Sequence, residues 1–420
     1  MTEHILDDLA WRGLISLTTG DDALRAALSA GPVTLYCGFD PTAPSLHIGN
    51  LVQILTVRRL QNAGHKPLLL VGGATGLIGD PKMAGERTLN PVDVVHQWVE
   101  RIRGQIEPFM NFEGENAARM VNNFDWTKDM SAIELLRDVG KYYRLGTMLA
   151  KDTVARRLNS DEGISYTEFS YQVLQGMDYL ELFRRYGCTL QTGGSDQWGN
   201  LTSGTELIRK AEGTSVHALA TPLITKADGT KFGKTESGTV WLDPELTSPY
   251  AFYQFWLNQA DADVIGYLKV FTFLSRERIE ELERAVAEEP FKREAQRVLA
   301  WEVTALVHGA ASADAVVEAS QALFGRGELG GLDATILAGV AAEVPGAEVP
   351  AGISVVDALV AASVVESKSA ARRAIAEGGA YVNNFKVESD EAVLSGADAL
   401  AGGFVVLRRG KKTVGLARLI

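Results

Sequence analysis

The stretch from Tyr36 to Asn50, Tyr-Cys-Gly-Phe-Asp-Pro-Thr-Ala-Pro-Ser-Leu-His-Ile-Gly-Asn, most constrains how this chain can fold. Apolar residues alternate at its start in the pattern of a strand, and two prolines then interrupt regular structure. Residues 51–60 repeat apolar side chains at helical spacing. The sequence therefore predicts a strand, a tight loop and a helix, with Thr42, His47 and Gly49 near the start of the helix.

The start of this helix is suited to a negatively charged ligand. Its first N–H groups have no partner within the helix and lie at the positive end of the helix dipole, which favours a phosphate. A glycine at this point lets a ligand approach the backbone closely. The same residues are compatible with an ordinary turn in which His47 is hydrogen-bonded locally, so the motif alone does not decide between the two interpretations.

Size and composition indicate an ordinary globular protein of two or three domains. The chain has 420 residues, of which 46% are hydrophobic and 22% are charged. Its two cysteines, Cys37 and Cys188, lie far apart, which argues against a disulfide framework or a zinc site. The first residues are acidic, and no apolar run reaches the roughly 18 residues of a membrane span. We therefore expect a cytoplasmic protein.

The net charge of −12 argues against nucleic-acid binding if it is taken for the chain as a whole. The C-terminal part differs from the rest, because residues 351–420 hold nine Lys and Arg against seven Asp and Glu. A local basic surface is therefore compatible with an acidic protein.

Two more segments end in glycine-rich turns of the kind that follow strands of a parallel sheet. Residues 66–81 contain an apolar run and then four glycines, without the Gly-Lys-Ser/Thr of a Walker A loop. Residues 191–200, Gln-Thr-Gly-Gly-Ser-Asp-Gln-Trp-Gly-Asn, precede a helix. This pattern predicts an open parallel sheet, whose ligands bind beyond the carboxyl ends of the strands. Each turn is also compatible with a purely structural role.

Two polar segments are candidates for contact with a small ligand. In a helix over 168–179, Tyr171, Gln175 and Asp178 fall on one face, where they suit a ligand with an ammonium group and a hydroxyl. Residues 227–238 form a polar, glycine-rich loop with two lysines that could reach a polyphosphate. Both segments are also compatible with a solvated surface.

Taken together and in this order, the segments resemble the motifs of one enzyme family. His47-Ile-Gly-Asn50 and Lys231-Phe-Gly-Lys-Thr235 resemble the two signature motifs of class I aminoacyl-tRNA synthetases. Three segments between them, 76–81, 171–178 and 193–200, resemble those of bacterial tyrosyl-tRNA synthetases, and the resemblance covers essentially the whole chain. The sequence departs from the family at Asn50, where histidine is usual, and in the loop of Lys82 and Arg87, which is one residue shorter.

The resemblance implies a reaction in two steps. Tyrosine and ATP give tyrosyl-adenylate and pyrophosphate, and the tyrosyl group then passes to the 3′-terminal adenosine of tRNA(Tyr). The first step needs positioning and charge neutralisation rather than a general base, because the tyrosine carboxylate is already ionised. Mg²⁺ is expected to arrive with ATP, and no metal site of the protein's own is expected, since the sequence shows no cluster of metal ligands.

The residue roles of the family fall on matching positions of this sequence. The catalytic residues would be Thr42, His47, Asn50, Lys231, Lys234 and Thr235. ATP would be bound by Gly38, Asp40, His47, Gly49, Asn50, Gly194, Asp196, Gln197 and Lys234. Tyrosine would be bound by Tyr36, Asp80, Tyr171, Gln175 and Asp178. Of these, Tyr36 and Asp178 would contact the phenol hydroxyl, so that phenylalanine would leave both unpaired and no editing domain is needed.

The resemblance also implies the fold and the domain organisation. We expect an α/β protein with a Rossmann-like, parallel-sheet catalytic domain over 1–245, which includes a helical insertion at about 92–160. An α-helical anticodon-side domain over 246–330, a linker over 331–352 and a small α+β, S4-like RNA-binding domain over 353–420 would follow. Contacts with tRNA would come from Lys368, Arg372, Arg373, Arg408, Arg409, Lys411 and Lys412. A homodimer is implied as well.

Two other classes of function remain open. The enzyme alternative is a tryptophanyl-type or other adenylate-forming class I ligase, against which the pair Tyr36 and Asp178 argues. The alternative without catalysis is an RNA-binding paralogue of a synthetase, against which the retention of His47, Lys231 and Lys234 argues.

Overall fold

The computed structural model describes residues 3–82, 85–230, 232–235, 238–410 and 413–420. The chain divides into two compact units. The first consists of Met1–Asp243 and Ile265–Ile279, and the second of Pro244–Val264 and Glu280–Ile420. No helix among the described residues is long and apolar enough to cross a membrane.

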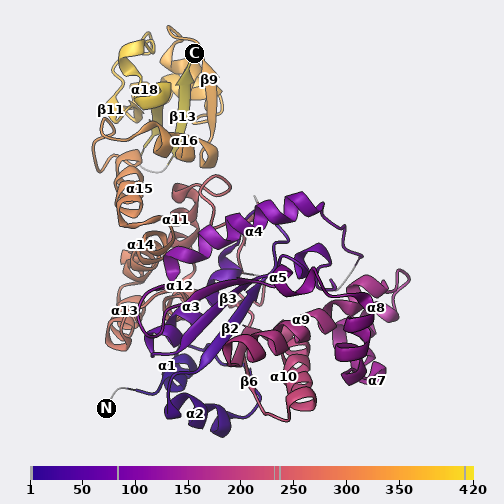
Figure 1. Cartoon of the computed structure of the whole chain (residues 1–420). Coiled ribbons are helices and arrows are strands. Elements are labelled where there is room, and N and C mark those ends of the chain that lie inside the picture. The colour runs from indigo at the N-terminus through magenta and orange to yellow at the C-terminus, as the bar shows by residue number, and fades with distance from the viewer. Residues whose placement is uncertain (1–2, 83–84, 231, 236–237, 411–412) are drawn as a thin grey trace. The chain divides into compact units, whose positions relative to one another are not determined.

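The first unit is built on a six-stranded sheet in the order β1-β6-β5-β2-β3-β4, with β2 and β3 side by side at its centre (Figure 1). All neighbouring pairs are parallel except β1 and β6. The strands are β1 Leu17–Thr18, β2 Thr34–Phe39, β3 Lys66–Val71, β4 Arg119–Asn122, β5 Cys188–Gly194 and β6 His217–Thr221. This arrangement confirms the predicted α/β fold with a parallel sheet. Because β2 lies between β3 and β5, ligands are expected beyond its carboxyl end, where the strand order reverses.

Both faces of this sheet are covered. Tyr36, Leu68 and Leu70 belong to a buried cluster with residues of α9 and α10. Leu35 and Leu69, which alternate with them along β2 and β3, are fully buried as well. The continuous apolar run of β3 follows from this two-sided burial.

The helices of the first unit differ in length and regularity. The longer ones are α1 Ile5–Trp11, α2 Asp21–Ala30, α3 Ile48–Asn62, α4 Val92–Ile106, α8 Asp152–Leu158, α9 Tyr166–Tyr186 and α10 Trp198–Glu212. The shorter turns are η1 Thr75–Leu77, η2 Glu107–Phe109, α5 Phe124–Thr127, α6 Ala132–Glu134, η3 Leu135–Val139, η4 Gly140–Tyr142, α7 Leu145–Leu149 and η5 Ser195–Gln197. A small hairpin, β7 Lys234–Thr235 with β8 Gly238–Thr239, completes the unit.

The N-terminal segment is more divided than its apolar pattern indicated. The apolar residues of 7–30 alone would predict one short amphipathic helix, but the structure has α1, β1 and α2 there. Gly13 adopts φ 74° just after α1, a left-handed conformation that ends a helix. β1 then pairs with β6 at the edge of the sheet, an interaction that no local pattern reveals.

The second unit combines helices with a five-stranded sheet in the order β11-β10-β12-β13-β9. Its helices are α11 Pro249–Leu257, η6 Pro290–Lys292, α14 Glu294–His308, α15 Ala310–Leu323, α16 Ala334–Glu343, α17 Val355–Ala361, α18 Lys368–Ala376, η7 Gly396–Asp398 and η8 Ala401–Gly403. Its strands are β9 Gly346–Val349, β10 Ala380–Val382, β11 Phe385–Lys386, β12 Phe404–Arg409 and β13 Thr413–Leu419. α12 Asp261–Phe271 and α13 Arg276–Glu288 each cross the boundary between the units.

The expected linker over 331–352 is not irregular chain. It contains α16 and β9, and β9 pairs in parallel with β13. The glycines and prolines that indicated a linker flank these elements or lie at their ends, while buried Leu337 and Val340 fix α16 in the unit. The smaller sheet therefore begins before residue 353, the predicted start of the last domain.

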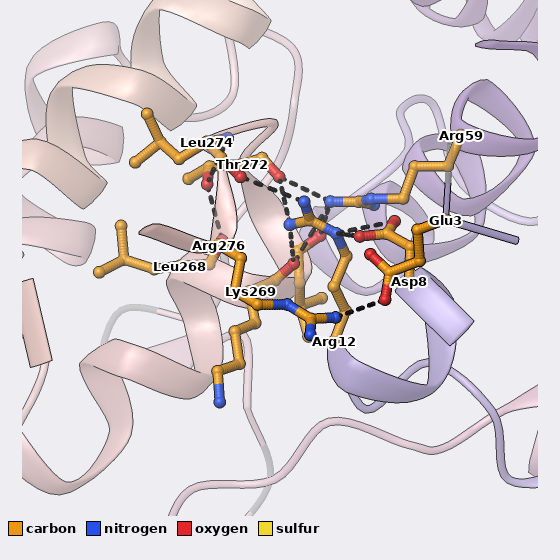
Figure 2. Close-up of polar contacts among 10 residues, drawn as sticks. Glu3, Asp8, Arg12, Arg59, Leu268, Lys269, Thr272, Leu274 and Arg276 are labelled. Carbon is orange, nitrogen blue, oxygen red and sulfur yellow. Dashed lines mark hydrogen bonds and ion pairs between the residues drawn. The ribbon is translucent and has the colours of Figure 1, made fainter. Parts of the chain in front are cut away.

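Two arginines hold the C-terminal end of α12 within the first unit (Figure 2). Arg12 donates to the carbonyl oxygens of Lys269, Thr272 and Leu274 at 2.9, 3.3 and 3.1 Å. Arg59, in α3, donates to the Thr272 carbonyl at 2.7 Å. The last carbonyl groups of a helix have no partner within it, so these guanidinium groups satisfy them and complement the helix dipole.

Candidate active site

The loop between β2 and α3 carries the first signature motif. His47 is the N-cap of α3, where its Nδ1 accepts a hydrogen bond from the Gly49 amide at 3.0 Å. Asn50 completes a capping box, because its Oδ1 accepts from the His47 amide at 3.1 Å. With Nδ1 acting as an acceptor, the proton of a neutral imidazole lies on Nε2, which is the form that can donate to a phosphate oxygen.

Glycines are required where the loops that follow β2 and β3 meet. A Cβ on Gly72 would collide with the Asp40 carboxylate and the Thr75 hydroxyl, and one on Gly76 would lie 2.6 Å from Pro41 Cγ. Gly38, exposed in the otherwise buried end of β2, leaves the backbone open there. The glycine-rich segment 72–79 thus provides close approach between two strand ends, as the pattern indicated.

A chain of hydrogen bonds links side chains beyond these strand ends. The Asp40 carboxylate accepts from the Tyr171 hydroxyl and from the Thr75 hydroxyl, each at 2.7 Å. Asn123 donates from its Nδ2 to Thr75 Oγ1 and to Asp178 Oδ2, both at 2.9 Å. Five polar side chains from four parts of the chain are thereby fixed relative to one another.

The far end of this network surrounds Asp178. Trp126 donates from its indole nitrogen to Asp178 Oδ1 at 2.8 Å, and Asn123 bonds the other oxygen. Thr75, Asn123 and Trp126 were not singled out in the sequence. The available signal was the position of Asn123 directly after a short strand, at the same sheet edge as the glycine-rich turns.

The environment of Asp178 and Tyr36 raises the pKa of both groups. Burial raises the pKa of Asp178 from its usual value to about 7. The hydrogen bonds from Asn123 and Trp126 have the opposite effect but are weaker than burial. Burial also raises the pKa of the Tyr36 phenol well above 10, with the Asp178 charge as a second cause. Among the described residues, the buried Tyr36 hydroxyl has no hydrogen-bond partner. Buried polar groups are normally paired, so this hydroxyl is available to a ligand.

Asp80 lies at the other side of the pocket and is bonded by residues of the 191–200 segment. Gln197 Nε2 donates to it at 2.9 Å and Asn200 Nδ2 at 3.0 Å. Burial raises the pKa of Asp80, with the Asp196 charge as a further cause, and burial likewise raises the pKa of Asp40, with the Asp80 charge as a further cause. Two buried carboxylates side by side favour a cationic ligand such as an ammonium group.

Other predicted residues lie at the rim of the same pocket. Gln175, in α9, has a buried Oε1 without a partner in the described part of the chain. Gly194 ends β5, where a Cβ would collide with the Asp196 carboxylate, so Asp196 follows the strand end as expected. Gln197 was expected at the ATP, but in the structure its side chain is engaged with Asp80.

The second signature motif is described only in part. Lys231 lies outside the described residues, and the side chains of Lys234 and Thr235 are likewise outside the description, although their backbone forms β7. Phe232 stacks on Phe271 of α12 with ring centroids 5.4 Å apart. Gly233, with φ 84°, lies where a Cβ would come within 3.0 Å of Ile48, the first residue of α3. The two signature motifs therefore meet at the start of α3.

The loop after Asp80 borders a polar pocket next to Thr42. Lys82, Arg87 and Thr42 line this pocket together with Gly79 and Asn90. Arg87 Nε donates to the backbone carbonyl of Asp80. Two cationic side chains next to a glycine-rich turn are suited to bind a phosphate or pyrophosphate group. Among the described residues, no group of three or more His, Cys, Asp and Glu could hold a metal ion.

The basic residues of the C-terminal part are placed unevenly. Lys368 pairs with Asp357 at 2.6 Å and Arg372 with Asp390 at 3.6 Å, while Arg373 and Arg409 are exposed. Lys411 and Lys412 fall outside the described residues.

Arg408 is buried and stacks on the Tyr381 ring at 4.1 Å. Its burial argues against the expected contact with RNA, because all residues of β12 from Phe404 to Arg408 are buried within the fold.

Comparison with known proteins defines first the class and then the family. A family model for tRNA synthetases class I (W and Y) matches residues 28–325. A second, for the tyrosine–tRNA ligase SYY-like C-terminal domain, matches residues 336–417. The parallel sheet, the two signature motifs at the start of α3 and the pocket beyond β2 are thus those of a class I tRNA synthetase.

Proteins with similar sequences and structures show to which family within this class the chain belongs. A tyrosine–tRNA ligase of Streptomyces avermitilis is 66% identical over 98% of this chain and 97% of its own length. Its counterpart in Corynebacterium glutamicum is 58% identical over 97% and 98% of the two chains. A C-terminally truncated mitochondrial tyrosyl-tRNA synthetase of Coccidioides posadasii superimposes with a TM-score of 0.67 and 34% identity, over 76% of this chain and 92% of that one. This chain belongs to the bacterial tyrosine–tRNA ligase family.

Proposed function

We propose that this protein joins tyrosine to tRNA(Tyr) at the expense of ATP. The tyrosine carboxylate attacks the α-phosphorus of ATP and pyrophosphate leaves, after which the tyrosyl group passes to the terminal ribose of tRNA. Family membership supports the reaction, and the observation that carries the choice of tyrosine is a Tyr36 hydroxyl without a partner among the described residues, close enough to Asp178 for that carboxylate to raise the Tyr36 pKa. A buried acceptor and a buried hydroxyl can recognise a phenol O–H, whereas an indole offers no such group.

The tyrosine side of the site divides between two ends of the pocket. Asp178 accepts a hydrogen bond from the substrate phenol, and Tyr36 donates to the phenol oxygen. Asp80, Tyr171 and Gln175 bind the ammonium group, which the paired negative charges of Asp80 and Asp40 attract. Asn123 and Trp126 orient Asp178, because each donates to one of its two oxygens.

The nucleotide side uses the start of α3 and the glycine-rich strand ends. Thr42, His47 and Gly49 contact the phosphates, with the His47 Nε2 proton as a donor, and Asn50 supports His47 through the capping box. Gly38, Asp40, Gly194, Asp196 and Gln197 surround the nucleoside, with Asp196 at the ribose. Lys231, Lys234 and Thr235 stabilise the leaving pyrophosphate. Mg²⁺ enters as part of the ATP substrate.

The tRNA would bind the α-helical domain over 246–330 and the S4-like domain over 353–420. The exposed basic residues Lys368, Arg372, Arg373 and Arg409 would contact it. Two of these are paired with acids, so RNA phosphates would compete with Asp357 and Asp390. Because charged tRNA is used in the cytoplasm, we place the protein there.

A homodimer is supported by a set of exposed apolar side chains in the helical segment before and at the start of α9. They are Ile133, Leu136, Leu145, Leu149, Leu158 and Tyr166. Exposed large apolar residues concentrated in one segment are typical of an interface with another protein chain.

Charging of tRNA tests this function. The purified protein, ATP, Mg²⁺ and labelled tyrosine are expected to give labelled, acid-precipitable tRNA, and labelled tryptophan none. Charging with tryptophan would favour the tryptophanyl-type alternative. Binding of tRNA without charging by any amino acid would favour the non-catalytic paralogue.

A further inference from the structure

A buried ion pair lies behind the loop of Lys82 and Arg87 and has no place in the tyrosine or nucleotide contacts proposed above. Arg157, in α8, donates to Glu168, in the first turn of α9, at 2.8 Å. The two side chains are only 1% and 2% exposed. Replacing such a pair by apolar residues often leaves stability unchanged, so its presence calls for an explanation other than stability.

The pair is bonded to both ends of the loop. Arg157 donates from one terminal nitrogen to the Lys82 carbonyl at 3.1 Å, and from Nε to the Gly163 carbonyl at 3.0 Å. Glu168 Oε1 accepts from the Arg87 amide at 3.1 Å, while its other oxygen holds Arg157. One cation and one anion thus fix the backbone at Lys82 and at Arg87 at the same time.

These two backbone positions determine where two cationic side chains lie. Lys82 and Arg87 line the polar pocket next to Thr42, and Arg87 also donates to the Asp80 carbonyl. A flexible lysine and a guanidinium reach a phosphate group productively only if the backbone that carries them is fixed. In a loop one residue shorter than the family usually has, external anchors at both ends would serve this purpose.

We propose that Arg157 and Glu168 are positioning residues for pyrophosphate departure, acting through the backbone of Lys82 and Arg87. The inference rests on the proposed function and assigns Lys82, together with Arg87, to the pyrophosphate side of the site. It concerns only adenylate formation and its reversal, because no pyrophosphate is bound when the tyrosyl group passes to tRNA.

The main variant is the double substitution Arg157→Met with Glu168→Leu, which removes both anchors but leaves the site filled with apolar side chains of similar size. Tyrosine-dependent exchange of labelled pyrophosphate into ATP is measured at several pyrophosphate concentrations. Tyrosine affinity is measured by equilibrium dialysis. Transfer to tRNA is followed in a single turnover from enzyme-bound tyrosyl-adenylate, isolated after long incubation with pyrophosphatase. Arg12→Met is the control, since it removes an equally buried arginine that does not contact this loop.

We expect at least a tenfold loss in the exchange rate or a tenfold rise in the KM for pyrophosphate in the double variant. Tyrosine affinity and single-turnover transfer in the double variant should stay within twofold of the wild type. In Arg12→Met, pyrophosphate exchange, tyrosine affinity and single-turnover transfer should all stay within twofold of the wild type. Unchanged exchange in a folded double variant would overturn the proposal, and so would equal losses in exchange, tyrosine affinity and transfer, which indicate general damage. If the double variant does not fold, Arg157→Lys serves instead, because one ammonium nitrogen does not reproduce the three separate donor positions that Arg157 uses for Gly163, Lys82 and Glu168, and the same pattern is expected. Absence of exchange in the wild type would instead count against the proposed function.

Discussion

Asp178 shows how burial sets the charge of a single residue at the centre of the site. Its pKa of about 7 in the folded protein lies above the usual value of 3.8, with burial as the largest cause. A raised carboxyl pKa means that the folded state binds the proton more tightly than the unfolded state. The stability gained in this way is present below about pH 4 and is lost as the pH rises through 7. Ligand selection should follow the same titration.

We expect discrimination between tyrosine and phenylalanine to weaken as the pH falls below 7. Phenylalanine leaves the buried Asp178 carboxylate without the phenol O–H that tyrosine donates to it, and this penalty is smaller when the carboxyl is neutral. The ratio of kcat/KM for tyrosine over phenylalanine in pyrophosphate exchange should fall, by at most about tenfold per pH unit. In Asp178→Asn the ratio should be lower and independent of pH. The same slope in wild type and variant would contradict this assignment.

His47 combines a structural and a chemical role that two substitutions can separate. Asparagine is a good N-cap, so His47→Asn should keep the thermal midpoint of the protein, whereas His47→Ala should lose about 1 kcal/mol of stability with the cap. Both variants lose the Nε2 donor, so both should lower kcat for adenylate formation by about 100-fold. Thermal unfolding and pyrophosphate exchange measure the two effects. Full activity in His47→Asn would show that only the cap matters.

At the scale of elements, α12 connects several parts of the first unit. Its C-terminal carbonyls are held by Arg12 and Arg59, and its Phe271 stacks on Phe232 of the second signature motif (Figure 2 shows the arginine contacts). The aromatic contact places this helix against the segment that we assign to pyrophosphate. Removing the arginine contacts at the C-terminal end of α12 should lower the free energy of unfolding and should change catalysis only weakly.

Arg12→Met should destabilise the protein by about 2 kcal/mol, because three carbonyl groups and Asp8 lose a charged donor in a mostly buried position. The midpoint of thermal unfolding measures this effect. Arg25→Met is the matched control, since Arg25 pairs with Asp7 at the surface, where an ion pair contributes little. Equal midpoints for the two variants would contradict the role given to Arg12.

The unit β2–loop–α3 could be predicted because its signals are local: an apolar run, two prolines and a helix start within one stretch. The pocket could be predicted only in part. Asp178 was singled out from the polar face of its helix and Tyr36 from the family resemblance, but Thr75, Asn123 and Trp126 join the network through contacts between distant segments. Arg157 and Glu168 were missed for the same reason, since each occurs in an ordinary helical pattern.

At the scale of the whole molecule, the chain ends in the antiparallel pair β12 and β13, within the part whose balance of basic over acidic residues the sequence shows. The sequence did not indicate that β9, within the expected linker, pairs with β13, because parallel pairing leaves no local signal. Assembly is a further property at this scale, and the exposed apolar side chains between residues 133 and 166 bear on it.

Tyr166→Asp should convert the proposed homodimer into monomers. Tyr166 is 73% exposed at the first position of α9, where an aspartate is compatible with the helix but not with an apolar interface. Sedimentation equilibrium should show about half the wild-type mass. Phe291→Asp, which changes an aromatic residue of similar exposure outside this segment, should leave the mass unchanged. A monomeric wild type would contradict the proposal.

The most direct test is pyrophosphate exchange into ATP with tyrosine, phenylalanine and tryptophan side by side, without tRNA. We expect exchange with tyrosine and little or none with phenylalanine or tryptophan. Exchange with tryptophan would contradict the roles of Tyr36 and Asp178. No exchange with any of the three would contradict the catalytic function itself.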